Sequence, residues 1–411
     1  MQKVLSILKG FMKEYILRNE YIKQITPFVD KDLIKVITGQ RRIGKSYLLF
    51  QLIDVIKKAN SKANIIYINK ELYEFDFIKD YHDLLNFVNE KTVQNIKNYL
   101  FVDEIQDIVQ FEKALRSLLT EKHFDIYCTG SNARFLSSDL ATYLSGRYIE
   151  FRVYSLSYGE FLIFHKLENN SQSLQFFMKF GGLPYLRNLS LNDEIIFDYL
   201  KNVFNTIILK DVVTRYNIRN VSFLENLIKY IADNTGSVVS AKKISDYLKS
   251  RRTSISPNIV LNYLNYLSSA FFIAKIRRID VKGKRVFEIG EKYYFEDMGL
   301  RHVVKPFVLT DIQKILENVV YNHLLFCGYK VSVGNLVNKE IDFVAEKKSE
   351  KIYIQVAYRI DNKSTEDREF GNLLAINDNY RKFVISMDEI QSASFEGIEH
   401  FYLGDFLIQF K

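Results

Sequence analysis

The feature that most constrains the fold is a glycine-rich loop between a short apolar run and an amphipathic segment. Residues 33–38 (LIKVIT) predict a buried strand, GQRRIGKS follows at residues 39–46, and residues 47–58 (YLLFQLIDVIKK) repeat apolar residues at helical spacing. The loop matches the pattern G-x4-G-K-[ST] in the strand, loop and helix context that this pattern requires. The sequence therefore predicts a phosphate-binding loop at the start of a helix.

Each residue type of this loop has a physical role in binding phosphate. Glycine lets the backbone approach the phosphates, while the amides and the helix N-terminus favour negative charge. The Lys45 ammonium would meet the β- and γ-phosphates, and the Ser46 hydroxyl would ligate Mg²⁺. We therefore expect ATP and Mg²⁺ as cofactors, with nucleotide contacts from Gly39, Gln40, Arg41, Arg42, Ile43, Gly44, Lys45, Ser46 and Tyr47.

A second motif, YLFVDEIQDI at residues 99–108, places two carboxylates at the end of a predicted buried strand. The carboxyl ends of parallel strands face the crevice in which such ligands bind. We expect Asp103 to hold Mg²⁺ and Glu104 to orient or deprotonate the attacking water, with Asp107 as the next acid to test. Together, the loop and the acidic strand end predict a Mg²⁺-dependent ATPase.

Polar residues beyond the later strands are further candidates for the site. Asn132 is the first choice for contact with the γ-phosphate and Ser131 the second, although a Ser-Asn turn that caps the next helix is an equal alternative. Arg147, in LSGRYIEF, is a candidate transition-state arginine that acts within the chain or on a neighbour's nucleotide in a homo-oligomer. Arg134 and Arg152 compete for this role, and a plain surface arginine is the default alternative.

The alternation of predicted elements indicates the fold class. Helical patterns separate the predicted strands, which implies an α/β fold with a parallel sheet and helices on both faces. A chain of 411 residues, of which 47% are hydrophobic, has room for two or three domains and is not disordered. The predicted strands lie near residues 33–38, 65–69, 99–103, 125–129 and 148–153.

The chain resembles prokaryotic AAA+-like P-loop ATPases that carry a C-terminal domain of unknown function. The resemblance rests on GQRRIGKS and YLFVDEIQDI and continues through YCTGSNARFLS, YLSGRYIEFRVYSLSYGEF, FGGLPY, ILKDVVTRYNIRN, KYYFEDMGLR and REFGNLLAINDNYRKFVIS. It implies an additional-strand P-loop fold that binds ATP and Mg²⁺, a winged-helix segment and a nuclease-like C-terminal module. The expected segments are the ATPase core at 1–160, a helical lid or connector at 161–235, a winged helix at 236–305 and a restriction-endonuclease-like domain at 306–411.

The expected winged helix is the most basic part of the chain. Residues 236–300 hold 12 basic and 6 acidic residues, a net charge of +6 out of +8 for the whole chain. Two helical patterns joined by a Ser/Pro turn precede a basic two-strand hairpin, which favours duplex DNA as partner, with protein contact as the alternative. The candidate phosphate contacts are Lys242, Lys243, Arg251, Arg252, Lys282, Lys284 and Arg285.

The last segment resembles the PD-(D/E)xK nuclease core, in which acidic residues hold Mg²⁺ and a lysine activates water. Glu317 and Asp342 would be the acids, and Gln355 stands where Glu or Gln is expected. Ala357 stands at the lysine position, so we expect a degenerate site without nuclease activity. The side chains that would compensate are Tyr358 and Lys351.

Composition narrows the remaining function classes. Two cysteines cannot staple a chain of this length, and no apolar stretch approaches the roughly 20 residues of a membrane span, so we expect a cytoplasmic protein with no membrane partner. The histidines are few and unclustered, which disfavours zinc. Three interpretations stay open: an ATP-driven switch or motor on DNA, an ATP-regulated nuclease, and a signalling or chaperone-like ATPase. The local charge favours the first.

Overall fold

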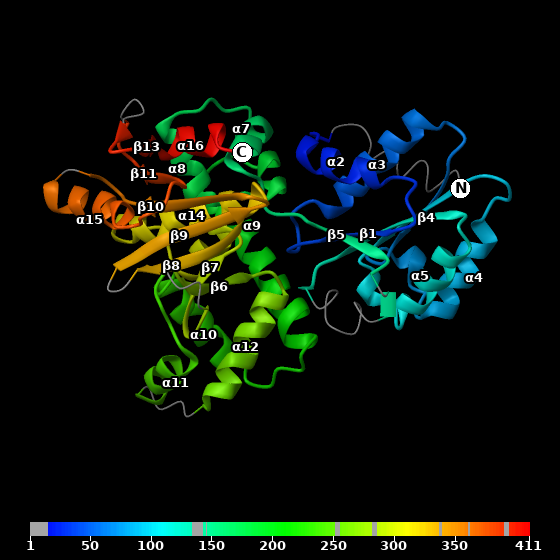
Figure 1. The fold of residues 1–411 in the computed structure, drawn as a ribbon. Coiled ribbons are helices and arrows are strands. Elements are labelled where there is room, and N and C mark those ends of the chain that lie inside the picture. The colour runs from blue at the N-terminus through cyan, green and yellow to red at the C-terminus, as the bar shows by residue number, and fades with distance from the viewer. Residues whose placement is uncertain are drawn as a thin grey trace. The chain divides into compact units, whose positions relative to one another are not determined.

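The chain divides into two compact units, Met1–Val153 and Tyr154–Lys411. The boundary expected for the ATPase core, residue 160, lies beyond this division and stays a prediction. The computed structural model of the chain (Figure 1) describes residues 15–133, 143–144, 146–250, 255–281, 286–336, 339–360, 362–389 and 394–411.

The first unit is built on a five-stranded parallel sheet in the order β2-β3-β4-β1-β5. Strand β4 is inserted between β1 and β3, and every residue of these three strands is buried. The predicted parallel α/β sheet is therefore confirmed. The strands are β1 (Ile34–Thr38), β2 (Asn64–Asn69), β3 (Asn98–Asp103), β4 (Phe124–Gly130) and β5 (Tyr148–Arg152).

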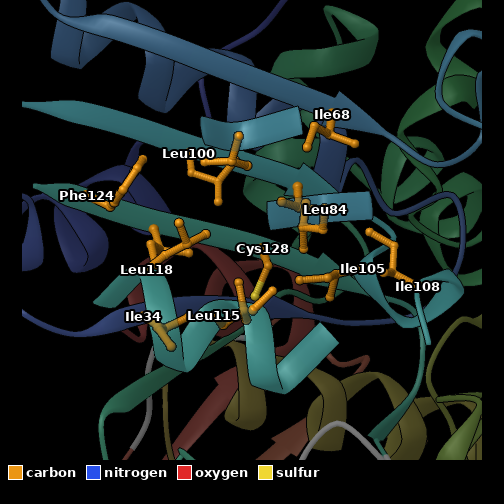
Figure 2. Close-up of a cluster of buried hydrophobic side chains, with 14 of the residues drawn as sticks. Ile34, Ile68, Leu84, Leu100, Ile105, Ile108, Leu115, Leu118, Phe124 and Cys128 are labelled. Atoms are coloured by element: carbon orange, nitrogen blue, oxygen red, sulfur yellow. The ribbon is translucent and has the colours of Figure 1, made fainter. Parts of the chain in front are cut away.

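Helices cover both faces of this sheet (Figure 1). On one face, Leu84 and Leu118 pack against Leu100 and Cys128 of the strands, as Figure 2 shows. Helix α3 follows the glycine-rich loop on the other face and buries its own apolar stripe, as the helical spacing in the sequence predicts. The described helices are α2 (Asn19–Ile25), α3 (Lys45–Ala59), α4 (Tyr81–Lys91) and α5 (Phe111–Thr120).

The second unit contains an eight-stranded sheet in the order β12-β13-β11-β10-β9-β8-β6-β7. Its strands are β6 (Ile273–Asp280), β7 (Val286–Phe295), β8 (Lys330–Leu336), β9 (Lys339–Lys347), β10 (Glu350–Val356), β11 (Arg381–Ser386), β12 (Ser394–Phe395) and β13 (Ile398–Tyr402). Because β6 pairs in parallel with β8, the hairpin expected in segment 236–305 shares one sheet with segment 306–411. The subdivision of this unit at residues 235 and 305 stays a prediction.

Helices of the second unit surround this sheet and extend beyond one end of it. They are α7 (Tyr158–His165), α8 (Ser171–Phe180), α9 (Asp193–Thr206), α10 (Val221–Asp233), α11 (Ala241–Ser250), α12 (Pro257–Ser269), α13 (Met298–Val304), α14 (Ile312–Phe326), α15 (Lys363–Leu374) and α16 (Leu403–Gln409), and a π-helical segment, Ile207–Thr214, continues α9. Figure 1 shows α11 and α12 together at that end. In the part of the chain that the structure describes, no helix has the length and apolar character to span a bilayer.

The glycines of FGGLPY serve a packing role in this unit. The Gly182 amide donates to Asp297 Oδ2 at 2.8 Å, and the same carboxylate caps α13 by accepting from the Leu300 amide at 3.1 Å. A Cβ at Gly181 would overlap the Asp297 carboxylate, and Gly181 has a φ of +75°. Gly181 and Gly182, which directly follow α8, therefore allow the end of that helix to pack closely against the start of α13.

Candidate nucleotide-binding site

The glycine-rich loop curls tightly between β1 and α3. Gly39 has a φ of +151°, and a Cβ there would overlap the Val153 carbonyl oxygen and the Ile43 side chain. Arg42 and Gly44 also have positive φ, at +70° and +91°. This backbone turns the chain back on itself before α3 begins at Lys45, as a loop that surrounds a phosphate must do.

The Lys45 side chain is buried inside this loop. Its ammonium donates to the carbonyl oxygens of Gly39 and Gln40, at 3.1 Å each, and lies 3.4 Å from Glu104 Oε1. Only 5% of the residue is exposed. The charge is therefore directed into the loop, where the sequence predicts phosphate, and faces one carboxylate.

Two oxygen ligands suited to Mg²⁺ meet beside this lysine. Asp103 ends β3, and its carboxylate is hydrogen-bonded to the hydroxyls of Ser46 and Thr129. Burial and the nearby Glu104 charge raise the pKa of Asp103, and these hydrogen bonds and Lys45 oppose that rise. Hard oxygen ligands at a phosphate site are what Mg²⁺ requires, so Ser46 and Asp103 fit the predicted role of holding it.

The Glu104 carboxylate lies between charged and polar neighbours. The residue has left-handed backbone geometry, with a φ of +55°, and its amide donates to Thr129 Oγ1 at 2.9 Å. Burial favours the neutral acid, but the charges of Lys45 and Arg41 outweigh it and lower the pKa of Glu104 to about 2. Glu104 is therefore ionised at neutral pH, as a general base must be.

Sequence reasoning missed two residues that position these carboxylates. Gln106 donates from its side-chain amide to Glu104 Oε2 and lies 3.5 Å from Ser131 Oγ. Thr129 bridges the Asp103 carboxylate and the Glu104 amide. The only signal was their position, because Gln106 follows the acidic pair and Thr129 lies near the end of the next strand.

The predicted γ-phosphate contacts lie beside this network. Ser131 and Asn132 directly follow β4, and both are buried, at 0% and 2% exposure. Ser131 approaches Gln106, which connects it to Glu104. Both therefore sit at the carboxyl edge of the sheet with the glycine-rich loop, and the choice between them stays a prediction.

The candidate arginines lie at opposite edges of the sheet. The Arg147 carbonyl accepts from the Ile34 amide at 3.0 Å, at the amino end of β1, whereas the loop follows the carboxyl end of that strand. The length of β1, about 16 Å at 3.3 Å per residue, exceeds the reach of an arginine side chain. Arg147 thus lies far from the loop of its own chain, and its role as a transition-state arginine stays a prediction. Arg152 pairs with Thr38 near the loop, and Arg134 lies outside the described residues.

The other predicted nucleotide contacts differ in exposure. Arg41 is buried and donates to Glu71 Oε1 at 2.7 Å. Arg42 and Tyr47 are exposed, with 45% of Tyr47 open to solvent. Arg42 and Tyr47 would therefore meet a nucleotide only at the rim of the loop.

A second cluster of charged side chains lies in the other unit. The Asp342 amide donates to Gln355 Oε1 at 2.7 Å, and the Gln355 amide group donates to Glu369 Oε2 at 2.8 Å. The Asp342 carboxylate accepts from the Val356 amide at 2.9 Å, and Glu317 of α14 lies close enough for its charge to add to burial in raising the pKa of Asp342. The three residues expected for the nuclease-like site, Glu317, Asp342 and Gln355, are thus brought together.

The cation in this cluster is Lys292 of β7. Its ammonium lies 2.8 Å from Glu340 Oε1 and 3.6 Å from Glu317 Oε2, and only 2% of the residue is exposed. Burial lowers the pKa of Lys292, but the surrounding carboxylates outweigh that and raise it. Lys351 instead lies over the rings of Tyr353 and Tyr380, away from the acids. Whether Tyr358 or Lys351 compensates for Ala357 stays a prediction.

The remaining candidates are only partly described. Lys242 and Lys243 are exposed on α11, while Arg251, Arg252, Lys282, Lys284 and Arg285 lie outside the described residues. Across the described part of the chain, no three His, Cys, Asp or Glu side chains form a group that could hold a metal ion.

Comparisons with known proteins place the first site inside a matched domain. Residues 31–162 match the family described as "AAA domain", and residues 171–311 match a domain of unknown function (DUF8612). An uncharacterized protein of Haemophilus influenzae is 37% identical over 404 residues, which cover 97% of this chain and all of that protein. The uncharacterized protein MJ1544 of Methanocaldococcus jannaschii is 32% identical over 390 residues, 88% of this chain and 84% of that one. The chain belongs to their family.

The fold has a relative of known structure. The Walker-type ATPase PABY2304 of Pyrococcus abyssi matches with a TM-score of 0.50 and 17% identity, over 72% of this chain and 97% of that chain. At this identity the likeness concerns the fold. The match of residues 31–162 to the AAA domain and the geometry of the glycine-rich loop agree with this fold.

Proposed function

We propose that this protein hydrolyses ATP with Mg²⁺ and uses the cycle as a switch or motor on duplex DNA. The observation that carries the ATPase part is the convergence of Lys45, Glu104 and Asp103 with the loop backbone. Lys45 is buried, points into the loop and faces an ionised carboxylate across 3.4 Å. A cation held by carbonyl oxygens and one carboxylate is ready to exchange these partners for phosphate oxygens.

This exchange links nucleotide binding to the activation of Glu104. When phosphate draws the Lys45 ammonium away, the carboxylate loses the strongest influence that lowers its pKa, while burial continues to raise it. Glu104 then becomes a stronger base, and Gln106 keeps one of its oxygens oriented. Mg²⁺, held by Ser46 and Asp103, would neutralise charge on the phosphates. Water activation is thereby confined to the ATP-bound state.

Completion of the site by a second copy of the chain is part of this proposal. Arg147 is exposed at the sheet edge opposite the loop of its own chain. An arginine so placed serves catalysis only by reaching the nucleotide of a neighbour. We therefore expect the ATPase rate per chain to rise with protein concentration. The same rate should fall in Arg147→Ala, with unchanged nucleotide affinity.

The DNA part of the proposal rests on the region from α10 to β7. Helices α11 and α12 precede the β6–β7 hairpin, and Val239, just before α11, bridges to Glu291 of β7. This order of elements, with an isolated bridge onto the hairpin, supports the proposal of a winged helix. Lys242 and Lys243 are exposed on α11, where they are free to neutralise phosphates.

The test is the ATPase rate and the binding of fluorescent duplex, single-stranded DNA and RNA at several salt concentrations. We expect duplex binding that weakens with salt and an ATPase rate that responds to duplex. Lys242→Glu/Lys243→Glu should weaken duplex binding and flatten its salt dependence. The matched control is Lys330→Glu/Lys348→Glu, which makes the same charge change at exposed positions elsewhere in the unit. A wild-type protein that binds none of these at low salt would make the α11–α12 region a protein-contact module.

A further inference from the structure

Helix α12 packs one face against the interior of the second unit. Ser256 caps its N-terminus, Pro257 occupies the first turn, and Val260, Leu264 and Leu267 are buried. The spacing of these apolar residues follows the helical repeat. The helix is therefore firmly packed, and its opposite face is fixed in orientation.

The opposite face carries three asparagines in a single stripe. Asn258, Asn262 and Asn265 are all exposed. At about 100° per residue they fall within a sector roughly 60° wide, on the side away from the buried face. The sequence of α12, PNIVLNYLNYLSS, contains no charged residue. The exposed face thus offers amide donors and acceptors without charge.

An uncharged amide face suits base edges better than phosphates. A side-chain amide offers a donor and an acceptor together, which match adenine N6 and N7 in the major groove. Ile259 and Leu261, 43% and 39% exposed, flank the stripe and offer apolar contact for thymine methyl groups. The axial rise from Asn258 to Asn265 is about 10.5 Å, close to three base-pair steps of about 3.4 Å each.

The cations lie on the neighbouring helix. Lys242, Lys243 and Lys249 of α11 are exposed, and the Ser245 hydroxyl of α11 donates to the Ile255 carbonyl just before α12. One helix thus carries charge and the next carries amides. This is the division expected where one element contacts phosphates and another reads bases.

We propose that α12 enters the major groove and reads adenine·thymine pairs through Asn258, Asn262 and Asn265. This inference rests on the proposed action on duplex DNA and deepens it, because it names the base that is recognised and the side chains that recognise it. A bidentate amide–adenine pair discriminates by roughly tenfold or more against another base.

The experiment selects duplexes from a pool with a randomised centre, using full-length protein, and then measures affinity for the selected and for a scrambled duplex. We expect enrichment of adenines at neighbouring positions and a preference for the selected duplex of about tenfold or more. Asn262→Ala should remove most of that preference. Asn202→Ala, a change of an exposed asparagine on α9, is the control and should retain it. Circular dichroism confirms that each variant is folded.

The outcomes separate this inference from the function on which it rests. Salt-dependent binding without enrichment, or enrichment that Asn262→Ala leaves intact, overturns base reading by α12 and leaves the action on DNA standing. Enrichment of guanine and cytosine pairs overturns it too. Absence of any duplex binding at low salt overturns both proposals.

Discussion

Lys45 of the first unit and Lys292 of the second are both buried beside carboxylates, and they differ in what surrounds the ammonium. Lys45 is held by two backbone carbonyls and lies 3.4 Å from Glu104. Lys292 lies between Glu340 and Glu317, at 2.8 and 3.6 Å. Carbonyl oxygens carry no net charge, so Lys45 retains attraction for an anion, whereas two carboxylates neutralise Lys292. The same residue type therefore recruits a ligand in one unit and serves as an internal counter-ion in the other.

The largest expected effect is that of Lys45→Ala. The loop loses the charge that meets the β- and γ-phosphates, so ATP binding or turnover should be abolished. Fluorescent-nucleotide binding and phosphate release measure this, with Lys62→Ala, at an exposed position of the same unit, as the control. Unchanged affinity and rate in Lys45→Ala would refute the assignment of the loop.

The next effect is that of Glu104→Gln, which retains the shape of the side chain but removes its basicity. We expect ATP to stay bound while hydrolysis falls by about 10²-fold or more, the scale of a lost general base. Single-turnover hydrolysis separates this effect from binding. Normal hydrolysis by the variant would move the base to another acid, with Asp107 the first to test.

At the other lysine, Lys292→Met should destabilise the second unit. The change leaves the Glu317 side chain, which is 12% exposed, without its cation, and removal of one partner of a buried pair costs about 3–5 kcal/mol of unfolding free energy. We expect a cost near the lower end of this range, because the Glu340 side chain is 37% exposed and can be solvated by water. Urea unfolding measures the cost, and Glu317→Gln in the same chain should recover part of it. Full stability of Lys292→Met alone would show that Lys292 is not a counter-ion.

The second unit should also be the more sensitive to mild acid. Burial, and then the nearby Arg301 charge, lower the pKa of His302 to about 3, and burial lowers that of His323 to about 4. Each imidazole is neutral when folded and protonates near pH 6.5 when unfolded, so stability is complete above pH 6.5 and falls as pH drops toward 4. Glu104 of the first unit affects stability only at lower pH. Because its pKa is about 2 when folded, the stability that its ionised form contributes is lost between about pH 4.5 and 2. Calorimetry between pH 7 and 4 should show the second unit losing stability first.

The two lysines also show what the sequence could and could not predict. The loop, Asp103 and Glu104 could be predicted because each motif is local and lies at the end of a predicted strand. A parallel sheet gathers the residues at its strand ends along one edge. Lys292 could not be predicted, because it meets Glu340 only through the pairing of β7, β6, β8 and β9 in one sheet, and Glu317 only through the packing of α14 against that sheet. The same holds for Arg147, whose two roles were separable only by the register of β5 against β1.

The smallest effect is an expected absence of cleavage by the second unit. A nuclease of the PD-(D/E)xK type needs carboxylates free to hold Mg²⁺ and a cation free to act on water or on the phosphate. Here the ammonium of Lys292 already engages Glu317 and Glu340, and Asp342 Oδ2 accepts from the Val356 amide. Binding of a divalent metal would have to displace Lys292.

We therefore expect no Mg²⁺- or Mn²⁺-dependent cleavage of plasmid, linear, branched or single-stranded DNA, with or without ATP. A gel assay with purified full-length protein measures this, and Asp342→Ala controls for contaminating nuclease. Cleavage that disappears in Asp342→Ala would show that the second unit is an active nuclease and that Lys292 is more than an internal counter-ion. Lys292 would then be the catalytic cation to test, because it is the lysine whose ammonium contacts Glu317 and whose pKa responds to the Asp342 charge.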